Sequence, residues 1–414
     1  MEVVISLILI AILAFSFHAA THITKSWLQP WLILCLPIGV AALLHSLALS
    51  DIVTPWEPLM AVLVVVAISL LFFFSIPGKK YTLTFPDIGS DRFLSHSPHS
   101  FNTIVLVSLV CIFFNYLEFG IAGQIPILTS DPEKSRFVIG GNGFLHVVSV
   151  CAIYLFPLIF MYLKTNNLVL SRARRWMMIF LMVFIVFTAL LWVSRGLLFV
   201  MFVMTFVINS AMSNRKVELK KIIKLVLFLV LIIVGVKVFR GYIEFGNDYF
   251  VSQQGEGGRG AAYWMVAYLT LCLNFEILSD YLRYFSSGGD HFGGLITISP
   301  FSTLLPVPKM TELMFQNQYL GYYRETTLTS TFLGVAYVDF GLFGVIFTSV
   351  AVASIYKFYF NQAFSGYKGF GLYCYSFLVV QALMLPYTNT IFQVHTVLFF
   401  SFAYMLRFLL KVRL

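Results

Sequence analysis

Arginines, tyrosines and carboxylates gather in one stretch of a chain that is otherwise rich in Leu, Ile, Val and Phe. This stretch, Phe239–Thr327, is the only long segment outside the opening loops that does not look membrane-spanning, and its arginines are Arg240, Arg259, Arg283 and Arg324. A guanidinium group binds phosphate oxygens through two parallel N–H donors in one plane, so these residue types suit a phosphorylated substrate. We therefore expect residues 239–327 to form a large catalytic loop on the outer face of a membrane.

Arg195 stands apart from this loop, between two apolar stretches that follow each other with almost no connection. It lies in Trp192-Val193-Ser194-Arg195-Gly196. Its side chain is expected at the outer interface or in a cavity, and an arginine that cannot simply enter water is a functional-site hypothesis by default. The alternative is an arginine that snorkels to lipid headgroups.

The remaining arginines each have a functional and a structural interpretation. Arg240 is expected at the outer headgroup level. Basic residues on that side run against the positive-inside rule, which favours a functional role over simple anchoring. Arg259 lies in Gly257-Gly258-Arg259-Gly260, where glycines let backbone amides approach an anion, although a mobile loop tip would have the same composition. Arg283 and Arg324 either bind an anion or decorate an amphipathic helix.

Carboxylates would be needed to activate a hydroxyl group. Asp339 is expected near the outer interface, either as a general base or, as the favoured alternative, as a structural partner for an arginine. Glu325, Asp280 and the pair Asp290-His291 are alternative bases. Tyr323 belongs to a group of tyrosines in the same region, which would form an interfacial aromatic belt or stack on sugar rings.

The composition limits the class of protein. Of 414 residues, 59% are hydrophobic and 11% are charged, too little polar surface for a water-soluble protein of this size. The net charge of +9 comes mostly from short loops on one predicted side, which reports membrane topology and not a nucleic-acid partner. The cysteines lack the spacing of a metal site, and His18 and His22, which share an HxxxH spacing, lack the following Glu of a zincin-type site, so no metal is expected.

Apolar runs near twenty residues predict an all-α polytopic membrane protein with about eleven transmembrane helices. Basic loops predict an outer N-terminus and an inner C-terminus. Ala261–Leu278 is expected to be an interfacial or re-entrant helix, because a crossing there would invert every later loop. The expected organisation is residues 1–238 with eight spans, 239–327 as the outer loop, and 328–414 with three spans. The expected spans are Glu2–Ala20, Trp31–Ala48, Leu59–Ile76, Phe101–Phe119, Phe144–Leu163, Met177–Val193, Leu197–Met212, Ile222–Val238, Asp339–Tyr356, Phe370–Leu385 and Ile391–Leu409.

Two short motifs and the late outer loop resemble a known family. Trp192–Gly196 between adjacent spans, and Thr329–Gly334 leading to Asp339-Phe340-Gly341-Leu342-Phe343-Gly344, are similar to bacterial oligosaccharide repeat-unit polymerases of the O-antigen (Wzy) type. The resemblance covers roughly residues 192–344. The family's pattern of two arginine-bearing loops is met only loosely, by Arg195 and Arg259.

The resemblance implies a metal-independent glycosyltransferase with a C-type membrane fold and no cofactor. It would work on the periplasmic face of the bacterial inner membrane, in O-antigen or lipopolysaccharide synthesis. Its partners would be undecaprenyl-pyrophosphate-linked oligosaccharides, the lipid bilayer and a chain-length regulator. The arginines and Tyr323 would bind pyrophosphate and glycan, and Asp339 or Glu325 would deprotonate or orient the acceptor hydroxyl. An O-antigen ligase, a flippase or transporter, and a non-catalytic assembly partner remain alternatives.

Overall fold

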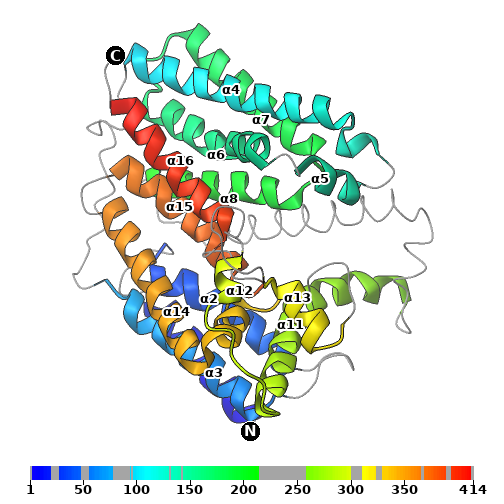
Figure 1. Ribbon diagram of the computed structural model, residues 1–414. Helices are drawn as coiled ribbons and strands as arrows, with labels where there is room; N and C mark the ends of the chain where they lie inside the picture. The colour runs from blue at the N-terminus through cyan, green and yellow to red at the C-terminus, as the bar shows by residue number, and fades with distance from the viewer. Residues whose placement is uncertain are drawn as a thin grey trace. The chain divides into compact units, whose positions relative to one another are not determined.

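The structure is a computed structural model, shown in Figure 1, and its described residues form helices and connecting turns without any strand. The described backbone covers residues 2–19, 28–47, 56–77, 94, 97–129, 132–140, 143–213, 258–299, 310–322, 329–364, 368–387 and 393–411. Some side chains within these ranges are not described, among them those of Arg195 and Arg259. The predicted helical fold class is confirmed for this part of the chain.

The chain divides into two compact units, each built from separate segments of the sequence. Unit 1 comprises Met1–Thr82, Tyr263–Asn361 and Gln381–Val397, and unit 2 comprises Leu83–Ala262, Gln362–Val380 and Leu398–Leu414. The last three helices, α14 (Phe332–Phe364), α15 (Lys368–Met384) and α16 (Val394–Lys411), contribute residues to both.

In unit 1, α1 (Glu2–His18), α2 (Pro30–Ser46) and α3 (Pro58–Ser75) pack against one another. Both α2 and α3 begin with a proline, whose fixed φ suits the first helical position and whose missing N–H is not needed there. The unit also holds most of α11 (Gly258–Ser286), together with the short helices α12 (Leu295–Ile298) and α13 (Glu312–Tyr319).

In unit 2, α6 (Gly143–Thr165) is the central helix. It packs against α4 (Pro98–Ala122), α7 (Arg172–Leu191) and α8 (Arg195–Met212). Consecutive residues of α6, including Tyr154, Leu155 and Phe156, are all buried, as expected of a helix that is apolar on every face. Between α4 and α6 lie a short 3₁₀ helix, η4 (Pro126–Leu128), and α5 (Pro132–Gly140).

The outer surface of α7 carries an apolar stripe at helical spacing. Trp176, Phe180, Val183 and Phe187 are between 51% and 66% exposed. They recur every three or four residues and so share one face of the helix. A continuous exposed apolar face of this kind marks a surface that meets another apolar phase. Together with the long apolar helices, it indicates a membrane protein.

Six described helices are long and apolar enough to cross a membrane, namely α3, α4, residues 145–165 of α6, α7, α14 and α16. Four shorter apolar helices lie within α1, α2, α8 and α15. Every expected span except Ile222–Val238, which lies outside the described residues, therefore falls on an apolar helix. The total of eleven spans and their sidedness remain predictions. Ala261–Leu278 lies within α11, so its helical structure is confirmed and its interfacial position remains a prediction.

The helix α14 begins earlier than the expected span and changes direction inside it. The predicted start was Asp339, whereas the helix begins at Phe332, whose backbone N–H donates to the Leu385 carbonyl. Gly341 interrupts the helix with φ 60° and ψ −147°, a conformation essentially restricted to glycine. A Cβ at Gly341 would also lie 3.0 Å from His291 Nε2. This glycine therefore allows the break in the helix, which lies two residues after Asp339.

Candidate functional site

The connection between α7 and α8 is a tight turn with an unusual backbone. Helix α7 ends at Leu191, α8 begins at Arg195, and Val193 in the turn has φ 48°. Among the described residues Val193 alone combines a positive φ with a side chain. A β-branched residue in this region is a genuine outlier costing about 1–3 kcal/mol, and such strain concentrates at functional sites. The turn is therefore a candidate site on backbone grounds alone.

Trp192 anchors this turn in the interior of unit 2. Its side chain is buried, and its Nε1 donates a hydrogen bond to Asn115 Oδ1 at 3.0 Å. Its ring lies 5.2 Å from the Phe119 ring and 5.4 Å from the His146 ring, measured between centroids. The tryptophan thus fixes the turn against α4 and α6, because both its apolar surface and its polar atom have partners.

A buried carboxylate lies beside Trp192. Glu118 on α4 has no solvent exposure; its Oε1 is 3.0 Å from His146 Nδ1, and its Oε2 accepts a hydrogen bond from Ser149 Oγ at 2.6 Å. His146 and Ser149 are three residues apart on α6 and so share one face of that helix. Partners on both oxygens are what a carboxylate needs if it is to stay buried. We refer to Glu118 and His146 as the Glu118–His146 pair.

His146, Ser149 and Trp192 border a pocket of about 130 Å³, which we call the Trp192 pocket. Residues from α4, α6, α7, the turn and α8 contribute to it. They are Asn115, His146, Ser149, Val150, Ala152, Ile153, Ile185, Thr188, Ala189, Trp192, Ser194 and Leu197. An apolar cavity with a few convergent polar groups is the usual form of a small-molecule site. Arg195 follows Ser194 directly and is the first residue of α8, although its side chain is not described.

The Glu118–His146 pair was missed in the sequence analysis, although a signal was present. Glu118 sits inside the apolar run Phe101–Phe119, and an ionisable residue within a predicted span is a functional-site hypothesis by default. His146 was not singled out as a functional residue either. Because the two residues lie on different helices, their sequence spacing gave no indication that they meet.

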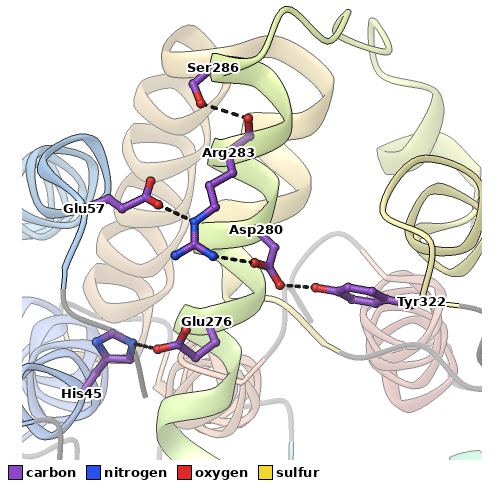
Figure 2. Close-up of polar contacts among 7 residues, drawn as sticks. All are labelled: His45, Glu57, Glu276, Asp280, Arg283, Ser286 and Tyr322. Carbon is purple, nitrogen blue, oxygen red and sulfur yellow. Dashed lines mark hydrogen bonds and ion pairs between the residues drawn. The ribbon is translucent and has the colours of Figure 1, made fainter. Parts of the chain in front are cut away.

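Unit 1 contains a second polar site along one side of α11, drawn in Figure 2. Glu276, Asp280 and Arg283 recur at helical spacing along α11, and we call them the α11 row. Glu276 Oε1 is 2.8 Å from Nε2 of the buried His45. Asp280 accepts a hydrogen bond from the Tyr322 hydroxyl and is 3.2 Å from Arg283 Nη1. The row therefore ties α11 to the end of α2 and to the segment after α13.

Arg283, one of the predicted phosphate ligands, already has two carboxylate partners. Its Nε donates to Glu57 Oε1 at 2.5 Å, in addition to its contact with Asp280. The hydrogen bond to Glu57 raises the pKa of the Arg283 guanidinium above its ordinary value. Two adjacent carboxylates would repel a third anion, so this environment favours a structural ion pair over phosphate binding.

Replacing Arg283 by alanine should therefore have a small effect. The side chain is 49% exposed, and solvent-exposed ion pairs contribute about 0–1 kcal/mol. We expect a change in unfolding free energy below about 1 kcal/mol, measured by thermal unfolding in detergent. A fall of several kcal/mol would contradict the assignment of Arg283 to a solvent-exposed ion pair.

Asp339, a predicted base, is buried and holds the start of α12. Its Oδ1 accepts from the Ile296 backbone N–H at 3.1 Å, and its Oδ2 accepts from the Thr297 N–H at 2.7 Å and the Thr297 hydroxyl at 2.6 Å. A carboxylate at a helix N-terminus satisfies N–H groups that have no partner within the helix. These contacts give the Asp339 carboxylate a structural role, and its catalytic role remains a prediction.

An Asp339→Ala substitution separates these roles. Loss of the carboxylate leaves buried N–H groups unpaired, so we expect unfolding free energy to fall by about 2–3 kcal/mol. The exposed Asp290 is the matched control, and Asp290→Ala should stay within about 0.5 kcal/mol of wild type. An Asp339→Ala protein as stable as the wild type but inactive would contradict the structural account.

The motif Thr329–Gly334 also has a structural explanation. Ser330 Oγ and Tyr281 Oη each donate to Glu312 Oε1 at 2.7 Å. Thr329 Oγ1 donates to Asn274 Oδ1 at 3.0 Å. Burial raises the pKa of the Glu312 carboxyl above its ordinary value, and it likewise raises that of Tyr281. These bonds join the start of α14 to α11 and α13.

The structure leaves several predicted site residues undecided. Arg259 lies near the start of α11, but its side chain is not described, and Arg240, Tyr323, Arg324 and Glu325 lie outside the described residues. Within the described part of the chain no group of three or more His, Cys, Asp or Glu side chains could hold a metal ion. Arg195 is therefore the one predicted arginine whose backbone position adjoins a described pocket.

Two of the polar sites among the described residues, one in each unit, differ in what they offer for chemistry. The α11 row consists of paired charges that join helices, whereas the Trp192 pocket combines open volume, a strained turn and a histidine oriented by a buried carboxylate. The second arrangement offers more for chemistry, because a ligand can enter it and meet a group able to exchange a proton. Comparisons with protein-family models, curated proteins and solved structures find no match for this chain.

Proposed function

We propose that this protein is a membrane glycosyltransferase that joins lipid-linked oligosaccharide repeat units. It would transfer the growing glycan from undecaprenyl pyrophosphate to the non-reducing end of the next lipid-linked unit. The motifs around Trp192–Gly196 and Thr329–Gly344, which resemble those of repeat-unit polymerases, suggest this reaction. The observation that carries the proposal is the Trp192 pocket, which borders the turn immediately before Arg195.

The chemistry of the leaving group matches the start of α8. Transfer of the glycan releases a lipid pyrophosphate, so negative charge develops at that group as the glycosidic bond breaks. The first N–H groups of a helix have no partner within the helix and favour an anion. Arg195, as the first residue of α8, would add a permanent positive charge. In this proposal the α8 start and Arg195 stabilise the departing pyrophosphate.

The membrane setting fits a lipid-linked substrate. Lys164 lies in the last turn of α6, and Arg172 begins α7. Both basic residues are therefore at the ends of these helices that lie away from the turn containing Trp192. If that basic end faces the cytoplasm, as the positive-inside rule predicts, the pocket faces the outside. The proposal therefore places the reaction on the extracytoplasmic face of the bacterial inner membrane, in surface polysaccharide or O-antigen synthesis.

A lipid-linked oligosaccharide flippase is the second candidate. Buried Glu118 inside an apolar helix is the kind of intramembrane charge that lines transport paths. An O-antigen ligase would share the donor and the chemistry and differ in its acceptor. These alternatives predict different products, so a single assay separates them.

Complementation of cells that lack the protein tests the proposal. We expect the wild-type gene to restore a ladder of polymer lengths on a gel, whereas uncomplemented cells carry a single repeat unit. Single units transferred to the final acceptor only after complementation would indicate a ligase. Lipid-linked units that stay on the inner face until the gene is supplied would indicate a flippase.

A further inference from the structure

We propose that His146 is the catalytic base that accepts the proton of the acceptor hydroxyl, with Glu118 as its positioning residue. This inference rests on the proposed glycosyl transfer and assigns the base to a residue other than Asp339 and Glu325. The observation behind it is the juxtaposition of the Glu118–His146 pair with the Trp192 pocket.

The hydrogen bonds of His146 define which of its nitrogen atoms is available. Glu118 has no solvent exposure, and its Oε1 lies 3.0 Å from His146 Nδ1. An ionised carboxylate only accepts hydrogen bonds, so the proton of a neutral imidazole then sits on Nδ1 and the Nε2 lone pair is free. Among the described residues Nε2 has no hydrogen-bond partner; the side chain is 37% exposed and is one of those that line the Trp192 pocket.

The surroundings hold this imidazole in place. Ser149 Oγ donates to the second oxygen of Glu118 at 2.6 Å, which fixes the carboxylate. The Trp192 ring lies across the imidazole at an interplanar angle of 63°. A histidine oriented by a buried carboxylate is the usual arrangement of a general base, because the carboxylate selects the tautomer and stabilises the imidazolium that forms.

The proposed step balances without a further reactant. The acceptor hydroxyl oxygen forms a bond to the anomeric carbon of the donor glycan while its proton moves to His146 Nε2. The bond between that carbon and the pyrophosphate oxygen breaks, and its electron pair leaves with the lipid pyrophosphate. Glu118 remains a carboxylate throughout, and His146 releases the proton to water before the next transfer.

The test uses membrane vesicles that contain the protein, supplied with lipid-linked repeat units extracted from cells that lack it. We expect His146→Ala to lower the polymerisation rate by about 10²–10⁴-fold, the usual contribution of a general base. Added imidazole should restore part of this rate by filling the space that the side chain left. Imidazole should leave the wild type unchanged.

Two further variants address folding. His146→Gln can still donate an amide hydrogen bond to Glu118 but cannot take a proton at neutral pH, so we expect it to be folded and equally slow. His99→Ala is the matched control. His99 lies at the end of α4 opposite to Glu118, and its Nε2 is 2.9 Å from the Leu409 carbonyl oxygen. It should polymerise at the wild-type rate.

The outcomes separate this inference from the proposed function. A wild type that builds no polymer in these vesicles overturns the glycosyl-transfer proposal and the role of His146 with it. A wild type that polymerises, together with a His146→Gln protein of unchanged rate, overturns the inference alone. If His146→Ala loses polymerisation and added imidazole does not restore it, the proposal that His146 is the base is also wrong, and the residue has a structural role.

Discussion

Replacing Arg195 by alanine should stop surface glycan at a single repeat unit while the protein still inserts in the membrane. Arg195 begins α8, next to Ser194 of the Trp192 pocket. A donor aimed at charge that develops in the transition state typically contributes 10²–10³-fold in rate, so we expect a loss of about this size. Gel analysis of the glycan in complemented cells, beside an immunoblot of membranes, measures both quantities.

Two matched variants make the Arg195 result specific. Arg195→Lys keeps the charge but loses the paired donors of the guanidinium, so we expect shorter ladders and no complete loss. Arg172→Ala removes an exposed arginine at the other end of α7 and should leave the ladder unchanged. A full ladder from Arg195→Ala would make this arginine a headgroup anchor and would shift attention to Arg240 and Arg259.

Replacing Trp192 by alanine should cause the largest loss of stability. The residue is 4% exposed, and its removal leaves a cavity and an unpaired Asn115. Truncating a buried tryptophan costs about 3–5 kcal/mol. The turn between α7 and α8 would also lose the side chain that fixes it against α4 and α6. We therefore expect the activity to fall together with the thermal unfolding midpoint in detergent.

Two controls separate burial from residue type. Trp176 on α7 is 60% exposed, so Trp176→Ala should have a much smaller effect on unfolding. Trp192→Phe keeps most of the ring but leaves Asn115 without its donor, and we expect a cost of about 1–3 kcal/mol. Equal destabilisation by Trp176→Ala and Trp192→Ala would contradict the anchoring role.

The helices were predictable because an apolar run must satisfy its own backbone hydrogen bonds in a membrane. This constraint is local, so the predicted spans Phe101–Phe119 and Met177–Val193 overlap the apolar helices Pro98–Ala122 and Arg172–Leu191. The start of α14 was misplaced because the helix has 33 residues, more than the roughly 20 that one membrane crossing needs. The helix α5 was not anticipated, because its nine residues are too short and too polar to give an apolar pattern.

The sites were harder to predict because their contacts are distant in sequence. His146 and Glu118 are 28 residues apart on different helices, and Arg283 and Glu57 are 226 apart. Nothing in the types or spacing of these residues shows which helices are neighbours. Arg195 could be singled out because its position between two adjacent spans is itself a local feature. Asp339 was also singled out, and only the folded chain reveals its bonds to α12.

The most direct test of the account is reconstitution of the purified wild-type protein in liposomes with undecaprenyl-pyrophosphate-linked repeat units as the only substrate. Gel electrophoresis would follow the glycan, and lipid analysis would follow released undecaprenyl pyrophosphate. We expect a ladder of lengths, with one lipid pyrophosphate released for each unit added. Repeat units that remain single, whether or not they cross to the other leaflet, would contradict the proposal that this protein forms glycosidic bonds.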